Sequence, residues 1–143
     1  MNLAVKIALL ASGVFLLAAM LVGILKYRGM MQSEKHEAPM YIDISHRAAL
    51  LYAFAALVIA KLLEFSPFAE NVQILISGVP LTYFALTIAA YVKLGLENRE
   101  TTQFSERTFV TTWFMYGLIA GEIGGITLIV GGFIYTQFFT QTL

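Results

Sequence analysis

Several ionisable side chains stand inside apolar stretches of this sequence, and three of them, Glu122, His46 and Lys61, could do chemistry there. Glu122 lies about halfway along an apolar run near the C-terminus, and His46 and Lys61 lie in the run 44–65. A carboxylate at the centre of a bilayer costs at least about 2.5 kcal/mol, so Glu122 should be neutral, paired or facing a cavity. Neutral histidine is a good ligand for haem iron or zinc. The three side chains therefore predict an ion pair, a proton-handling site or a metal site.

Lys61 is the expected partner of Glu122. Each residue lies fifteen positions beyond a candidate helix entrance, which is His46 for Lys61 and Arg107 for Glu122. Helix rise then places both side chains about 22 Å from the same side of the membrane. Glu64 lies one turn from Lys61 on the same face. We expect a buried Lys61–Glu122 pair, which could either join two helices or handle protons.

His46 and His36 have simpler interpretations as well. His46 opens the second apolar run beside Tyr52, where a lone histidine often caps a helix or bonds at the surface, and His36 lies among charged residues in a polar loop. The chain has no cysteine, no HExxH motif, no Ser/His/Asp set and no phosphate-binding glycine loop. These absences disfavour a hydrolase and a zinc site made by protein ligands alone.

Composition places these residues in a membrane protein. Hydrophobic residues make up 59% of the 143, charged residues only 13%, and the mean hydropathy is +0.77. Soluble domains carry about 25% charged residues. Nine basic residues balance nine acidic ones, so nothing in the charge suggests a nucleic acid partner. The bilayer is the expected environment.

Four apolar runs are each long enough to cross a hydrocarbon core of about 30 Å as a helix. They predict a single all-α unit over 1–143, a bundle of four transmembrane helices at about 3–25, 44–65, 72–94 and 108–135. Asp43 or Ser45 is expected to cap the second helix, and Pro67 to follow its end. Pro80 should kink the third helix.

The predicted orientation follows from the lysines and arginines. Most of them lie in or beside the polar connections 26–43 and 95–107, whereas the opposite side offers only Lys6 and Lys61. By the positive-inside rule both connections face the cytoplasm and both termini face outward. We expect a multi-pass protein of a bacterial inner membrane.

A run of glycines marks the fourth helix. Gly117, Gly121 and Gly125 recur every four residues, which lets another backbone approach closely. The spacing leaves three partners open: another helix of the chain, another protomer or a flat cofactor.

The first half of the chain resembles a known family. SGVFLLAAMLVGI in the first run precedes a polar loop and an S-H-x-x-x-L-L pattern at Ser45, His46, Leu50 and Leu51. This arrangement is similar to the opening of the small four-helix membrane isomerases that include styrene oxide isomerase and hydroxylaminobenzene mutase. The resemblance covers about sixty residues and rests mostly on common apolar types.

The resemblance implies a trimer that binds haem b, with His46 as the axial ligand and Tyr52 or Tyr83 orienting the substrate. In the epoxide isomerase, ferric iron acts as a Lewis acid on the epoxide oxygen. This chain departs from the family where Tyr52 and Ala53 replace a common asparagine and glycine, and in having Lys61.

Two functions of different classes therefore remain open. One is a haem-dependent isomerase acting on a small apolar molecule, with Lys61 and Glu122 as further candidate catalytic residues. The other is a non-enzymatic subunit of a larger membrane complex, docked through the glycines. A transporter is less well supported, because the polar path would consist of only Lys61, Glu64 and Glu122.

Overall fold

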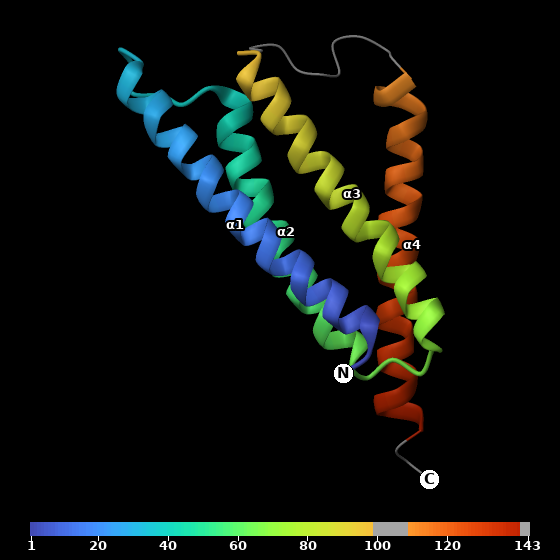
Figure 1. The fold of residues 1–143 in the computed structure, drawn as a ribbon. Helices are drawn as coiled ribbons and strands as arrows, with labels where there is room; N and C mark the ends of the chain where they lie inside the picture. Colours follow the sequence, from blue (N-terminus) through green and yellow to red (C-terminus); the bar gives the residue numbers. More distant parts are fainter. Residues whose placement is uncertain (99–108, 141–143) are drawn as a thin grey trace.

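The structure is a computed structural model that describes residues 1–98 and 109–140. Its elements are α1 (Leu3–Gln32), α2 (Met40–Leu63), α3 (Glu70–Leu96), η1 (Val110–Phe114), α4 (Met115–Ile134) and η2 (Tyr135–Phe139). The wider π-type turns η1 and η2 continue the rod of α4 at either end (Figure 1). No strand occurs in the described ranges, and four helical segments are long and apolar enough to span a membrane. The predicted all-α fold of four membrane-spanning helices is confirmed.

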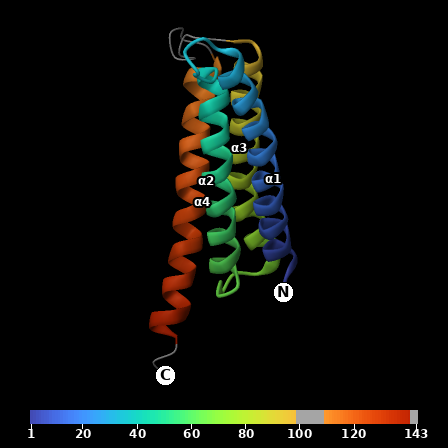
Figure 2. The same ribbon diagram turned by 90° about the vertical axis from the view of Figure 1, so that its left-hand side faces the viewer.

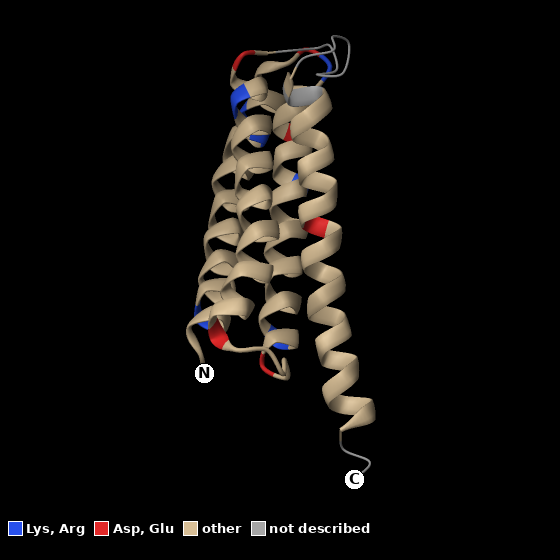
Figure 3. Cartoon of the chain, turned by 90° about the vertical axis from the view of Figure 1, so that its right-hand side faces the viewer, with Lys and Arg blue, Asp and Glu red and all other residues tan. Residues whose placement is uncertain are grey.

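The helices form an up-and-down bundle. The α1–α2 connection lies at one end, and the N-terminus, the α2–α3 connection and the C-terminal end of the α4 rod lie at the other (Figure 1). α1 and α2 make the most extensive contact, whereas α4 packs mainly on α3 and touches α2 less. Figure 2 shows the α4 rod extending beyond the other helices at its C-terminal end. Charged positions gather mostly toward the two ends of the bundle (Figure 3).

The first polar connection is shorter than predicted. α1 continues to Gln32 and α2 already begins at Met40, so only 33–39 of the predicted 26–43 joins the helices. Lysine and arginine side chains can reach the membrane surface from inside a helix, so charge does not mark the helix end. The predicted connection at 95–107 and helix start at 108 fall largely on 99–108, outside the described residues.

The predicted cap of α2 is wrong. The N-cap is Pro39, with φ of −52° and ψ of 133°, and no side chain caps the helix. Proline holds φ near the value that a helix start needs, so the helix can begin before Asp43. Asp43 lies in the first turn and Ser45 is buried inside the helix. The last helical segment also runs further than predicted, to Phe139.

Alanines explain the close contact of α1 with α2. Alanine is the commonest buried residue of the two helices: Ala4, Ala8 and Ala19 on α1, and Ala49, Ala53, Ala56 and Ala60 on α2. Small side chains let two helices approach within a membrane, where packing replaces the hydrophobic effect as the attraction. The Ser12 hydroxyl donates a 2.8 Å hydrogen bond to the Ala53 carbonyl oxygen across this contact.

The glycines of α4 pack on α3 of the same chain. A Cβ at Gly121 would lie 2.8 Å from Val79, and one at Gly125 would lie 2.5 Å from the Ile76 carbonyl oxygen. Pro80 has no amide hydrogen to offer this carbonyl, although α3 continues through the proline. The backbone of α4 therefore lies against the one turn of α3 that lacks its helical hydrogen bond. Of the three partners left open by the sequence, the neighbouring helix is the one observed.

Candidate functional site

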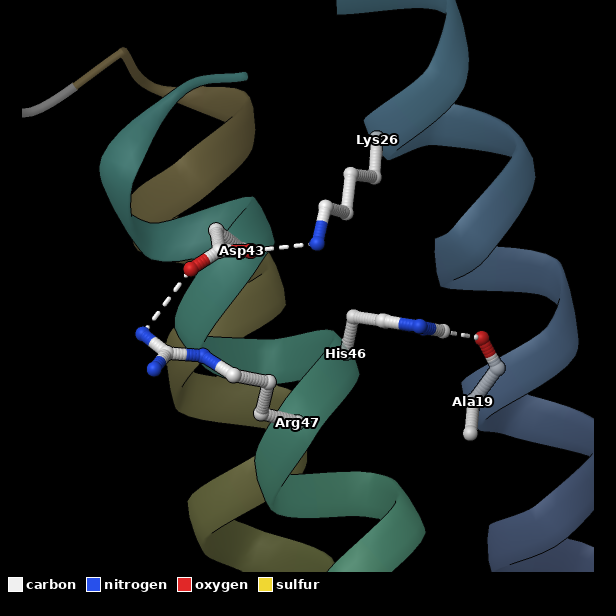
Figure 4. Close-up of polar contacts among 5 residues, drawn as sticks. All are labelled: Ala19, Lys26, Asp43, His46 and Arg47. Atoms are coloured by element: carbon white, nitrogen blue, oxygen red, sulfur yellow. Dashed lines mark hydrogen bonds and ion pairs between the residues drawn. The ribbon is translucent and has the colours of Figure 1, made fainter. Parts of the chain in front are cut away.

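His46 is held in one tautomer by the backbone of α1. Its Nδ1 lies 2.9 Å from the Ala19 carbonyl oxygen (Figure 4). A carbonyl only accepts, so Nδ1 carries the hydrogen, and the neutral ring keeps its lone pair on Nε2. A Cβ at Gly23 would lie 3.1 Å from the ring carbon Cε1. The absence of a side chain at Gly23 therefore makes room for the half-buried imidazole between α1 and α2.

An ion-pair cluster joins α1 to α2 one turn from His46. Asp43 pairs with Lys26 of α1 at 2.6 Å and with Arg47 of α2 at 2.8 Å (Figure 4). The sequence did not predict this cluster, because Lys26 and Asp43 were expected to lie in the polar connection 26–43. The i,i+4 spacing of Asp43 and Arg47 was the available signal.

Glu122 lies in the middle of α4 with one oxygen unsatisfied. The residue is half-buried, and its Oε1 is buried without a hydrogen-bond partner among the described residues. At this depth an ionised carboxylate costs at least about 2.5 kcal/mol. Buried polar atoms in proteins nearly always have a partner, so this one needs a physical explanation.

Tyr52 is the polar group of α2 that faces this region. Its ring stacks on Phe84 of α3, with centroids 4.2 Å apart and planes 6° apart. Its hydroxyl shares a hydrogen bond with Thr87, and Tyr52 interacts electrostatically with Glu122. Two of the candidate residues, Tyr52 and Glu122, are thus brought together between α2, α3 and α4.

The predicted Lys61–Glu122 pair does not form. The Lys61 Nζ lies 2.7 Å from Glu64 Oε2, and its side chain is 67% exposed. α2 begins at Met40 rather than near His46, so Lys61 lies about 32 Å along its helix. Glu122 lies only about 20 Å from Phe109, where the described part of the fourth helix begins at the same end of the bundle. The sequence predicted the same membrane depth for Lys61 and Glu122, and this prediction was wrong. Lys61 lies toward the end of the bundle opposite Phe109.

Tyr83 occupies a third place, at the contact between α3 and the α4 rod. It packs edge-on against Phe114 at 5.4 Å and against the backbone of α4 at Gly117 and Gly121. The adjoining groove has a volume of about 490 Å³ and is open and mainly apolar. Its lining residues are Ile74, Leu75, Gly78, Val79, Thr82, Tyr83, Leu86 and Phe114.

The candidate residues therefore do not form one cluster within this chain. His46 lies on the α1 side of α2, Tyr52 and Glu122 lie on the α4 side, and Lys61 is near the far end. Among the described residues, no three histidine, aspartate or glutamate side chains come close enough to hold a metal ion.

No protein-family model, curated protein or solved structure is significantly similar to this chain. The resemblance to the four-helix isomerases stays a prediction.

Proposed function

We propose that this chain is a multi-pass membrane protein that binds haem b through His46 and isomerises a small apolar molecule such as an epoxide. The observation that carries the proposal is the bond between His46 Nδ1 and the Ala19 carbonyl. A second partner that fixes the tautomer and ring orientation is the usual companion of a metal-ligating histidine. The neutral imidazole is thereby prepared to ligate through Nε2.

Two cations near His46 suit a haem group. Lys26 and Arg47 both pair with Asp43, one turn before His46, and such cations can pair with propionate carboxylates. Both cations already share Asp43, which holds them in place on α1 and α2. When bound, ferric haem supplies a Lewis acid that polarises the oxygen of an epoxide. His46 holds the group, and Tyr52 or Tyr83 orients the substrate.

The proposal includes a homo-oligomer, which the family resemblance makes a trimer. Because His46 lies apart from Tyr52 and Glu122 within one chain, a site that uses all three residues would need side chains from neighbouring copies. Many large apolar side chains on the outer faces of the helices are exposed, and lipid or a second copy can cover them. The alternative, a non-enzymatic subunit of a larger membrane complex, stays a prediction. The glycines expected to dock on a neighbour already pack on α3.

We also propose that the protein lies in a bacterial inner membrane with the connections 26–43 and 95–107 in the cytoplasm. The described part of the first connection and the end of α3 at Leu96 lie at the same end of the bundle, which supports a shared side (Figure 1). Lys26, Arg47 and Lys93 lie toward this end.

The absorption spectrum of the protein purified in mild detergent tests the haem proposal. We expect a Soret band that His46→Gly abolishes and that added imidazole restores, since free imidazole can replace the missing side chain. His36→Ala is the matched control and should keep the band. A colourless preparation, or a band that survives in His46→Gly without imidazole, would refute the proposal. Conversion of styrene oxide to an aldehyde by the protein that shows the Soret band then tests the proposed isomerisation.

A further inference from the structure

Glu122 is an acidic residue inside the membrane-spanning helix α4. α4 carries its acidic residue midway along its length, whereas most charged positions lie toward the ends of the bundle (Figure 3). Oε1 of this residue is buried and has no partner in the described part of the chain. A buried carboxyl oxygen without a partner indicates that something outside the described residues completes the site.

No cation compensates the carboxyl within the described residues. Their ion pairs are Lys26–Asp43, Arg47–Asp43, Lys61–Glu64 and Lys93–Glu97, and none of them includes Glu122. The titratable group that α2 turns toward Glu122 is Tyr52, and from α3 the Tyr83 ring lies against the neighbouring Gly121. Both are phenols, which do not neutralise a carboxylate. The neutral acid is therefore the form that suits this environment.

The packing of α4 leaves Glu122 Oε1 without a partner among the described residues. Gly121 and Gly125 contact α3 so closely that they fix the rotation of α4 about its axis. Glu122 interacts electrostatically with Tyr52 of α2, a helix that α4 touches much less than it touches α3. The Tyr52 hydroxyl already shares a hydrogen bond with Thr87. The Tyr52 hydroxyl therefore does not account for the missing partner of the half-buried Glu122 carboxyl.

We propose that Glu122 is a protonated carboxyl within the bilayer that binds small apolar molecules by donating a hydrogen bond to an oxygen or nitrogen lone pair. A protonated carboxyl has one O–H donor to offer. Tyr52 of α2 interacts electrostatically with Glu122 and stacks on Phe84. This site needs no haem, so it goes beyond the function proposed above and can be tested separately.

Dicyclohexylcarbodiimide is the probe, because this apolar reagent reacts only with protonated carboxyls. The carboxyl proton passes to one nitrogen of the reagent while a carboxyl oxygen bonds to the central carbon. The acyl group then leaves that oxygen for the second nitrogen, which gives a stable acylurea. No atom is lost, so the protein gains the mass of one whole reagent molecule. Peptide mass mapping of the purified protein in lipid vesicles at neutral pH locates the product.

We expect the product at Glu122 and not at Glu64, whose carboxylate is paired with Lys61. Glu122→Gln should abolish the mass increase, and the control Glu64→Gln should leave it unchanged. Peptide mass mapping of the labelled wild-type protein decides the outcome even if Glu122→Gln does not fold. Absence of the product at Glu122, or equal reaction at Glu64, would overturn the proposal.

Two competitors of the same shape test ligand recognition. Acetophenone has a carbonyl oxygen where ethylbenzene has a methylene group. We expect acetophenone to slow the labelling of Glu122 several-fold and ethylbenzene to leave the rate unchanged. Equal rates with both compounds would overturn the assignment of a hydrogen-bonding site. A colourless protein that still labels at Glu122 would refute only the haem proposal, and a haem protein that does not label would refute only this one.

Discussion

The contact between α4 and α3 makes a quantitative prediction about Gly125. A Cβ there would lie 2.5 Å from the Ile76 carbonyl oxygen and 3.1 Å from Pro80 Cδ, whereas ordinary contacts begin at 3.4 Å. Gly125→Ala must therefore push the two helices apart by about 1 Å at this point or distort α3, and overpacking of this kind costs about 1–3 kcal/mol. Alanine gains about 1 kcal/mol over glycine in helix propensity, which partly offsets the cost.

Gly124→Ala is the matched control, because a Cβ at that position meets nothing within 4 Å. Both variants gain the same helix propensity. The difference between their unfolding midpoints therefore reports only the contact of Gly125 with α3. We expect Gly125→Ala to unfold about 4–8 °C below Gly124→Ala, which corresponds to about 2 kcal/mol in a chain of this size. Thermal unfolding followed by circular dichroism in one detergent measures the difference. Equal midpoints would refute the close approach of α4 to α3.

Three further predictions concern other parts of the chain. Gly23→Val should displace the His46 ring and lower the Soret absorbance per protein, because a Cβ at Gly23 already lies 3.1 Å from Cε1; an unchanged spectrum would contradict the position of the ring. Ser12→Ala should destabilise the protein by about 0.6 kcal/mol in the same unfolding assay, since it removes the hydrogen bond to the Ala53 carbonyl oxygen; no measurable change would argue against that bond. A reporter enzyme that works only outside the cytoplasm should be active when fused after Leu143, and one that works only inside the cytoplasm should be inactive there. The reverse pattern would overturn the orientation predicted from the positive-inside rule.

The number and class of the helices could be predicted because a bilayer leaves long apolar stretches few alternatives to helix. The helix ends could not be predicted equally well. Hydropathy reports where the polar surface of the membrane begins, whereas a helix ends where its backbone geometry changes. Lys26 therefore belongs to α1, and Asp43 lies inside α2, although both were assigned to a polar connection.

The same distinction explains what was missed at the candidate site. The depth of Lys61 was counted from His46, which is not the start of α2, and so the pairing with Glu122 was wrong. The acceptor for His46 is a backbone carbonyl, which every residue carries, so no sequence pattern could single out Ala19. The partner of the α4 glycines depended on the rotation of each helix about its axis, which packing determines.

The missing hydrogen bond at Pro80 has a mechanical consequence. The two halves of α3 can bend about this point at lower cost than elsewhere, because no bond between Ile76 and Pro80 has to break. Gly125 lies directly on the Ile76 carbonyl, so a bend of α3 displaces α4 with it. Glu122, less than one turn away, then moves relative to Tyr52. Flexing of α3 is thereby coupled to the position of the Glu122 carboxyl within the bundle.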